Sequence, residues 1–158
     1  MEGKKHRPFL LYFLLVLLLF VGIGGVYGGT VLIADPTGEI LQLDINFINT
    51  TSFKNYLLPG IILLIFNGLI PLFTFYSLLR QPGWNWPETM NIYKDHSWEW
   101  TFSLYSGIIL VIWIYIQMLI IGYIGTIQSV FGLLGTFITI LTLVPSVKDH
   151  YLKPQEYL

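Results

Sequence analysis

Three ionisable side chains before the third apolar stretch, Asp95, His96 and Glu99, come closest to a catalytic or metal-binding pattern. On a helix, residues three and four apart share a face, so Glu99 would lie beside the other two. Zinc and iron sites need more ligands, and none of suitable spacing lies nearby. Charged residues commonly flank transmembrane helices, so we interpret the three as marking the membrane boundary. Catalysis at the membrane surface is the alternative; we predict no catalytic residue, metal or cofactor.

Two amides lie inside otherwise apolar stretches, and they are the other candidates for chemistry. Asn67 is near the middle of the second stretch, and Gln117 is in one half of the third, with Trp113 one turn before it. At about 1.5 Å per residue, the two amides lie about 15 Å and about 9 Å from one membrane surface. They could hydrogen-bond between helices, which is worth about 0.6 kcal/mol. Alternatively, all three residues could line a ligand cavity between helices.

These residues are carried by four apolar stretches that contain no Asp, Glu, Lys, Arg or His. A helix of about 20 residues crosses a hydrocarbon core of about 30 Å, and each stretch approaches this length. We therefore predict a single all-α membrane domain, a bundle of four transmembrane helices. The predicted spans are residues 8–27, 57–79, 102–123 and 127–144, joined by loops at 28–56 and 80–101 and followed by a tail at 145–158.

Composition excludes several functions. The formal net charge of -1 provides no basic surface for nucleic acid. Without cysteine there is no disulfide, zinc–thiolate or thiol redox chemistry. Proton-coupled transport normally uses ionisable residues inside the membrane, and the predicted spans contain none. All three histidines lie outside the spans, which argues against a haem held between helices.

The basic residues predict the orientation. Seven of the eight fall before the first span, between the second and third, or after the fourth, and only Lys54 falls in the loop at 28–56. Cytoplasmic loops carry the excess of Lys and Arg, so we predict cytoplasmic N- and C-termini in a multi-pass protein. The loop at 28–56 would then face outward.

The outward loop has the pattern of a small β-hairpin. Val31–Ala34 is a short apolar run, Asp35–Gly38 has the residue preferences of a type I turn, and residues 39–45 alternate between apolar and polar. We therefore expect a β-hairpin between the first two helices. Pro59-Gly60, just inside the second span, suits a break or kink.

Small residues four apart indicate where helices approach closely. Gly24 pairs with Gly28 and Gly25 with Gly29 at the end of the first span, and Ser103 pairs with Gly107 in the third. These glycines could pack helices within one chain. They could instead form a docking face for a second copy or another membrane protein.

Four segments resemble a family of small four-helix bacterial inner-membrane proteins that has no assigned activity. They are the Gly-Gly end of the first span, ADPTGEILQL at 34–43, SFKNYLLPG at 52–60, and the W-x-x-x-Q-x-x-x-x-G of Trp113, Gln117 and Gly122. The resemblance implies a bacterial inner membrane and no known site residues. The topology is also similar to that of claudin-like proteins, but this chain lacks their loop cysteines.

Two functions follow from these patterns. The first is a non-enzymatic membrane protein that resides in the lipid bilayer and binds a partner or a second copy of itself, or supports an assembly. The alternative is a binder or carrier of an uncharged or lipidic small molecule, with a site at Asn67, Trp113 and Gln117.

Overall fold

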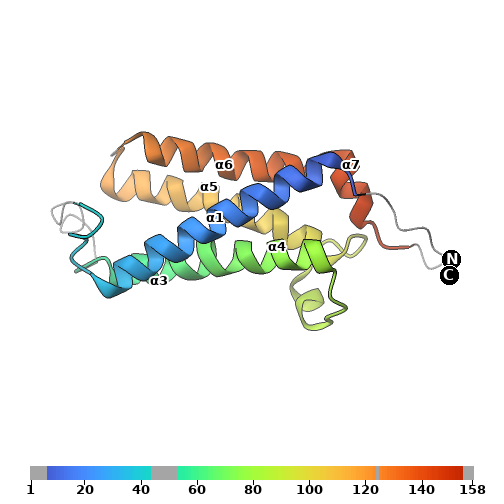
Figure 1. Ribbon diagram of the computed structural model, residues 1–158, viewed down its shortest axis with the longest axis horizontal. Coiled ribbons are helices and arrows are strands. Elements are labelled where there is room, and N and C mark those ends of the chain that lie inside the picture. Colours follow the sequence, from blue (N-terminus) through green and yellow to red (C-terminus); the bar gives the residue numbers. More distant parts are fainter. Residues whose placement is uncertain (1–6, 44–52, 124, 155–158) are drawn as a thin grey trace.

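The computed structural model describes residues 7–43, 53–123 and 125–154, and it is a bundle of long helices (Figure 1). In this part of the chain, four helical segments are long and apolar enough to cross a membrane. The prediction of an all-α, four-span membrane bundle is confirmed. The four segments are α1 (Phe9–Ala34), the second span (Leu57–Arg80), α5 (Trp98–Ile121) and α6 (Thr126–Leu143).

The second span changes from α-helix to π-helix and back. It consists of α3 (Leu57–Ile62), the π-helix η1 (Leu63–Leu69) and α4 (Ile70–Arg80). Pro71 explains the π-helix, because in an α-helix its ring would clash with the carbonyl of Asn67, four residues back. The wider π turn relieves this clash: the N–H of Ile70 donates to the carbonyl of Ile65, five residues back. Pro59 lies in the first turn of α3, where proline is tolerated, so the irregularity expected there occurs in η1 instead.

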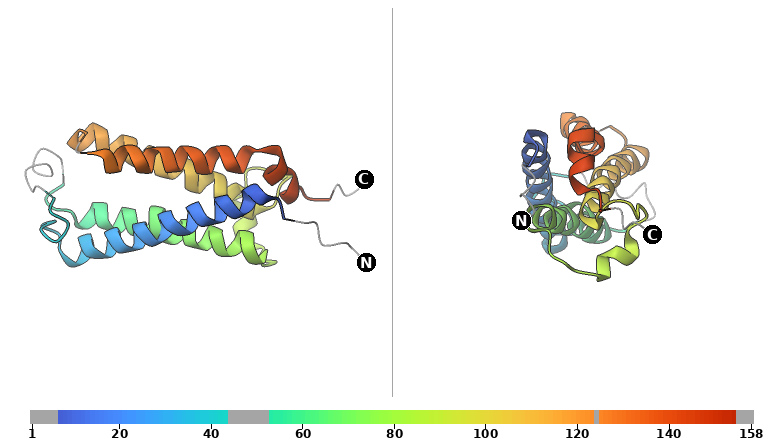
Figure 2. Two further views of the ribbon diagram at one scale, coloured as in Figure 1. Left: turned by 45° about the horizontal axis from the view of Figure 1, so that its top comes forward. Right: turned by 90° about the vertical axis from the view of Figure 1, so that its right-hand side faces the viewer.

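The helices form two pairs. α1 packs along the second span, and α5 packs along α6. Figure 2 shows the pairs closer together near the chain termini than at the opposite end of the bundle. Much of the buried core lies in the half nearer the termini. It includes Leu11, Leu14, Leu18, Leu78, Trp100 and Ile138.

The start of α1, the end of the second span and the chain after α6 meet at one end of the bundle, called here the termini end. The guanidinium of Arg7 donates to the carbonyl of Leu79 at 2.6 Å. The hydroxyl of Tyr151, in the short helix η3 (Asp149–Tyr151) after α7 (Pro145–Lys148), donates to the carbonyl of Leu78 at 2.9 Å. An even number of membrane crossings is consistent with this arrangement.

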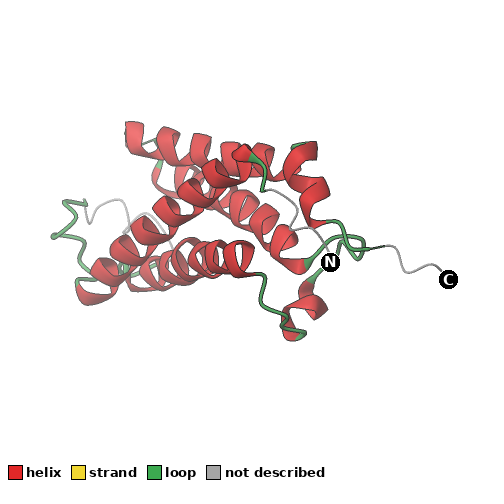
Figure 3. Ribbon diagram, turned by 45° about the vertical axis from the view of Figure 1, so that its right-hand side comes forward, coloured by secondary structure: helices red, strands yellow, loops and turns green. Residues whose placement is uncertain are grey.

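The predicted β-hairpin is wrong, because the described residues contain no strand (Figure 3). Val31–Ala34 instead continues α1 past its predicted end at residue 27. The extra turns keep the backbone N–H and C=O groups paired, which a bilayer requires. They also pack Leu32 closely against Gly60 of α3.

Beyond α1 the chain winds into two consecutive turns. In the first, the N–H of Gly38 donates to the carbonyl of Asp35 at 3.1 Å, as the turn prediction expects. In the second, Gln42 donates to the carbonyl of Glu39 at 2.9 Å. Gln42 adopts a left-handed backbone with φ of 54°, so the alternating pattern cannot extend as a strand. The last two residues of the predicted strand, 44 and 45, lie outside the described residues.

Asp35 organises this loop through its carboxylate. One oxygen, Oδ2, accepts the N–H of Ile40 at 2.8 Å, and the other, Oδ1, accepts the N–H and hydroxyl of Thr37 at 3.2 and 2.5 Å. These bonds favour the ionised form and hold the pKa of Asp35 below its ordinary value, the Ile40 bond contributing most.

Acid is expected to loosen the 35–43 loop by protonating Asp35. Because the pKa is lower in the folded loop, the carboxylate stabilises the fold above its ordinary pKa of about 3.9, and this contribution is lost as the pH falls through the lower folded value. In isoleucine-labelled protein, the Ile40 amide resonance should hold its position down to about pH 4 and move only below it. Asp35→Asn should abolish that transition. A transition at or above the ordinary value would contradict this role.

Candidate functional site

Asp95, His96 and Glu99 do not form the shared helical face considered above. Residues 91–97 precede α5 and are not helical, so only Glu99 lies on the helix. The Asp95 side chain is 68% exposed and its Oδ1 lies 3.0 Å from Nδ1 of the buried His96. This contact lowers the pKa of Asp95. In the described ranges, no group of three His, Cys, Asp or Glu side chains is placed to hold a metal ion.

Hydrogen bonds around these residues fasten the loop before α5 to the rest of the termini end. The buried Asn91 donates from Nδ2 to the carbonyl of His96 at 2.9 Å and accepts the Thr101 hydroxyl at 2.6 Å. The N–H of Lys153 donates to the carbonyl of Asp95 at 3.0 Å. The His96 ring stacks on Trp100 with centroids 4.5 Å apart. These contacts give Asp95 and His96 a structural role in holding the loop.

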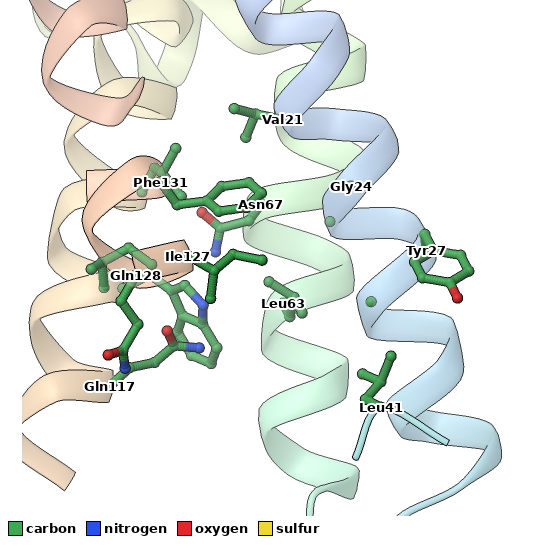
Figure 4. A pocket seen from close by; sticks show the side chains of 15 residues that line it. Val21, Gly24, Tyr27, Leu41, Leu63, Asn67, Gln117, Ile127, Gln128 and Phe131 are labelled. Carbon is green, nitrogen blue, oxygen red and sulfur yellow. The ribbon is translucent and has the colours of Figure 1, made fainter. Parts of the chain in front are cut away.

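A cavity of about 340 Å³ lies between the two helix pairs, in the half of the bundle away from the termini (Figure 4). α1, η1, α5 and α6 all contribute to its lining, and Leu41 reaches it from the loop after α1. Asn67, Trp113 and Gln117, the three residues proposed as a ligand site, all line this one cavity. None of its 15 described lining residues is ionisable at neutral pH.

Asn67 is the most unusual residue of the lining. Its side chain is 2% exposed, and neither Oδ1 nor Nδ2 has a hydrogen-bond partner among the described residues. Figure 4 shows the amide pointing from η1 into the space between Phe131 and Leu63. An unpaired buried polar group costs about 1–3 kcal/mol. The interhelical hydrogen bond considered for Asn67 is therefore absent here, and the amide is available to a molecule in the cavity.

The glycines of α1 pack against the second span, line the cavity, or do both. Gly25 and Gly29 face the second span so closely that a methyl group on either would overlap the backbone of Asn67 or Leu64. Gly24, Gly25 and Gly28 line the cavity. A methyl group on Gly24 would meet only the Phe131 ring, at 3.8 Å, so this glycine leaves usable space.

Gly107 packs α5 against α6. A methyl group there would lie 2.5 Å from the hydroxyl oxygen of Thr139 and 3.0 Å from the carbonyl oxygen of Gly135. The small residues thus lie in contacts within the chain or on the cavity.

Sequence reasoning missed two groups that complete the cavity. Gln128, in the first turn of α6, is 3% exposed and donates to the carbonyl of Gly122 at 3.3 Å. Its position in an uncharged span is the signal that identified Asn67 and Gln117, so it could have been found in the same way. Leu41 carried no such signal, because its place depends on how the loop after α1 turns back.

The fold and cavity define a four-span α-helical membrane protein with an uncharged, partly open cavity between its two helix pairs. Comparisons with protein families, curated proteins and solved structures found no match to this chain. The cavity is therefore the feature on which the proposed function rests.

Proposed function

We propose that this protein binds a small, uncharged lipidic molecule in the cavity between its two helix pairs. The observation that carries the proposal is the unpaired amide of Asn67 on the wall of an otherwise mainly apolar cavity. Small-molecule sites are typically concave and apolar with a few placed polar groups, and range from about 300 to 1,000 Å³. A ligand that meets Asn67 would recover the cost of burying that amide.

The orientation and membrane are part of the proposal. Among the basic residues that the structure describes, Arg7, Arg80, Lys94, Lys148 and Lys153 lie toward the termini end, and only Lys54 lies toward the other end. By the positive-inside rule we place the termini end in the cytoplasm, and we place the protein in a bacterial inner membrane. The cavity then lies in the outer half of the bilayer, where lipidic molecules from the outer leaflet can reach it.

The other predicted function, docking of a partner through the glycines of α1, has less support. Gly25 and Gly29 pack against the second span, and Gly24, Gly25 and Gly28 line the cavity. Binding of a second copy or another membrane protein stays a prediction without a surface assigned to it.

Filling the cavity is expected to abolish ligand binding while leaving the fold intact. Gly24→Leu would add four carbons, and the first of them, the Cβ, would meet only the Phe131 ring, at 3.8 Å. The test is labelling of the protein in lipid nanodiscs by a photoreactive alkyl-diazirine analogue of 1-decanol, followed by mapping of the modified peptides. We expect labels on residues 21–28 and 110–117, and a loss of about tenfold or more in Gly24→Leu, equivalent to about 1.4 kcal/mol.

The matched control is Ile23→Phe, which adds bulk at the neighbouring position, where the side chain is 57% exposed and faces away from the core. Its labelling should equal that of the unmodified protein. Equal labelling of Gly24→Leu, or labels spread evenly over the lipid-facing surface, would contradict the proposal.

A further inference from the structure

We infer that the ligand carries one uncharged group that both donates and accepts a hydrogen bond, such as a hydroxyl or a primary amide, on an alkyl body of about ten carbons. This inference rests on the proposed function and narrows it to a chemical class. Three properties of the cavity lead to it: its charge, the state of Asn67 and its size.

The absence of charge excludes ionised ligand groups from the interior. All 15 described residues of the lining are uncharged, so an ammonium, carboxylate or phosphate would be buried without a counterion. Such burial is strongly unfavourable in a medium of low dielectric constant. An anionic or cationic headgroup would have to stay outside the cavity.

The amide of Asn67 selects for hydrogen bonding of both kinds. Its Nδ2 offers donors and its Oδ1 offers an acceptor, and both are unpaired. A hydrocarbon would leave both atoms without a hydrogen bond. An ether or ketone can only accept, so it would pair with Nδ2 and leave Oδ1 without a donor. A hydroxyl or a primary amide can meet both.

The other amides lie nearer the opposite end of the cavity. Figure 4 shows Val21 and Phe131 at one end, Gln117 and Leu41 toward the other, and Asn67 between them. The stretch between Asn67 and Gln117 is bordered by Leu63 and Ile127. The polar group of the ligand therefore sits at Asn67, and its alkyl body lies against these apolar side chains.

The volume of the cavity limits the size of the ligand. Taking about 30 Å³ for a water-sized group, 340 Å³ holds about eleven non-hydrogen atoms. A ten-carbon alcohol matches this number. A two-chain phospholipid is several times larger and would not fit.

The test compares competitors of equal size against the photoreactive decanol analogue in nanodiscs. 1-Decanol, undecane and the decylammonium ion each have about eleven non-hydrogen atoms, matching the cavity. Concentrations are expressed as mole fraction in the bilayer, so that membrane partitioning does not bias the comparison. We expect 1-decanol to displace the probe at about tenfold lower mole fraction than either of the others, as for a ligand that pairs a buried amide.

Asn67→Leu is the diagnostic variant, because it keeps the number and branching of the side-chain heavy atoms and removes their hydrogen bonds. In this variant, the mole fractions of 1-decanol and undecane that displace the probe should agree to within about twofold, as for a site without polar groups. Ile65→Leu, on the same helix with a 42% exposed side chain, should keep the full advantage.

The outcomes separate the inference from the function it rests on. Equal competition by undecane and 1-decanol in the unmodified protein, or stronger competition by decylammonium, would overturn the inference while leaving a ligand-binding cavity. An advantage of 1-decanol that persists in Asn67→Leu would overturn it as well. Failure of all three to displace the probe would overturn both, and would leave water as the occupant of the cavity.

Discussion

Replacing Gly25 with alanine is expected to destabilise the bundle severely, although it adds a single methyl group. That methyl would overlap the backbone carbonyl of Asn67, and backbone within a packed helix cannot move aside cheaply. Overpacking of this kind costs about 1–3 kcal/mol and occasionally more. Because the new contact is with backbone, we expect at least about 3 kcal/mol, measured by unfolding in mixed detergent micelles.

Gly24→Ala is the matched control for this prediction. The two glycines are adjacent on α1, and both should gain about 1 kcal/mol of helix propensity on change to alanine. At Gly24 the methyl would make an ordinary contact with Phe131, so this variant should be as stable as the unmodified protein or more stable. Similar stability of the two alanine variants would mean that α1 does not pack against η1 at Gly25.

Trp100→Ala is expected to have an effect of comparable size at the other end of the bundle. The indole is 1% exposed, belongs to the buried core and stacks on His96. Its N–H donates at 2.8 Å to the carbonyl of Thr142, one of the last carbonyls of α6, which lack partners within their own helix. Truncation of a buried Trp costs about 3–5 kcal/mol, and the Thr142 carbonyl would lose its donor as well.

The comparison variant is Trp86→Ala, whose indole is 58% exposed. It should change stability far less in the same detergent unfolding assay. Trp100→Phe should fall between the two, because it keeps most of the packing and loses the hydrogen bond to Thr142. An equal loss for Trp86 and Trp100 would show that these indoles act only as anchors at the membrane surface.

These two sites explain how a cavity persists inside a small bundle. Gly25 and Gly29 bring α1 against the second span. The buried core that includes Trp100 contains residues of both helix pairs and joins them near the termini. Away from the termini the pairs separate, and Gly24 and Gly28 contribute no side chains to fill the space. The cavity therefore lies where the helix pairs are not closely packed. The glycines of α1 allow close contact with the second span and also leave space in the cavity.

Much of this architecture could be predicted from the sequence. The length of an apolar stretch and its lack of charged residues determine whether that segment spans the bilayer, independently of the other segments. A stretch of uncharged apolar residues long enough to span the bilayer must form a helix there, whatever its neighbours do. The same reasoning identified Asn67 and Gln117, since an amide inside such a stretch is conspicuous without any knowledge of packing. The turn at Asp35–Gly38 was also predictable, because its preferences are local.

Tertiary structure decided the rest. The apolar run Val31–Ala34 indicated a strand, yet α1 continues to Ala34 because its packing on α3 and the pairing of its backbone outweigh that pattern. Whether Asn67 would bond to another helix or face a cavity depended on the separation of two helix pairs, which no single segment encodes. Asp95 and His96 failed to join a helical face for a similar reason: contacts with residues far along the chain, such as Lys153, hold that loop in place. Local solvation selects the helices, but only contacts between distant segments determine which polar groups are left unpaired.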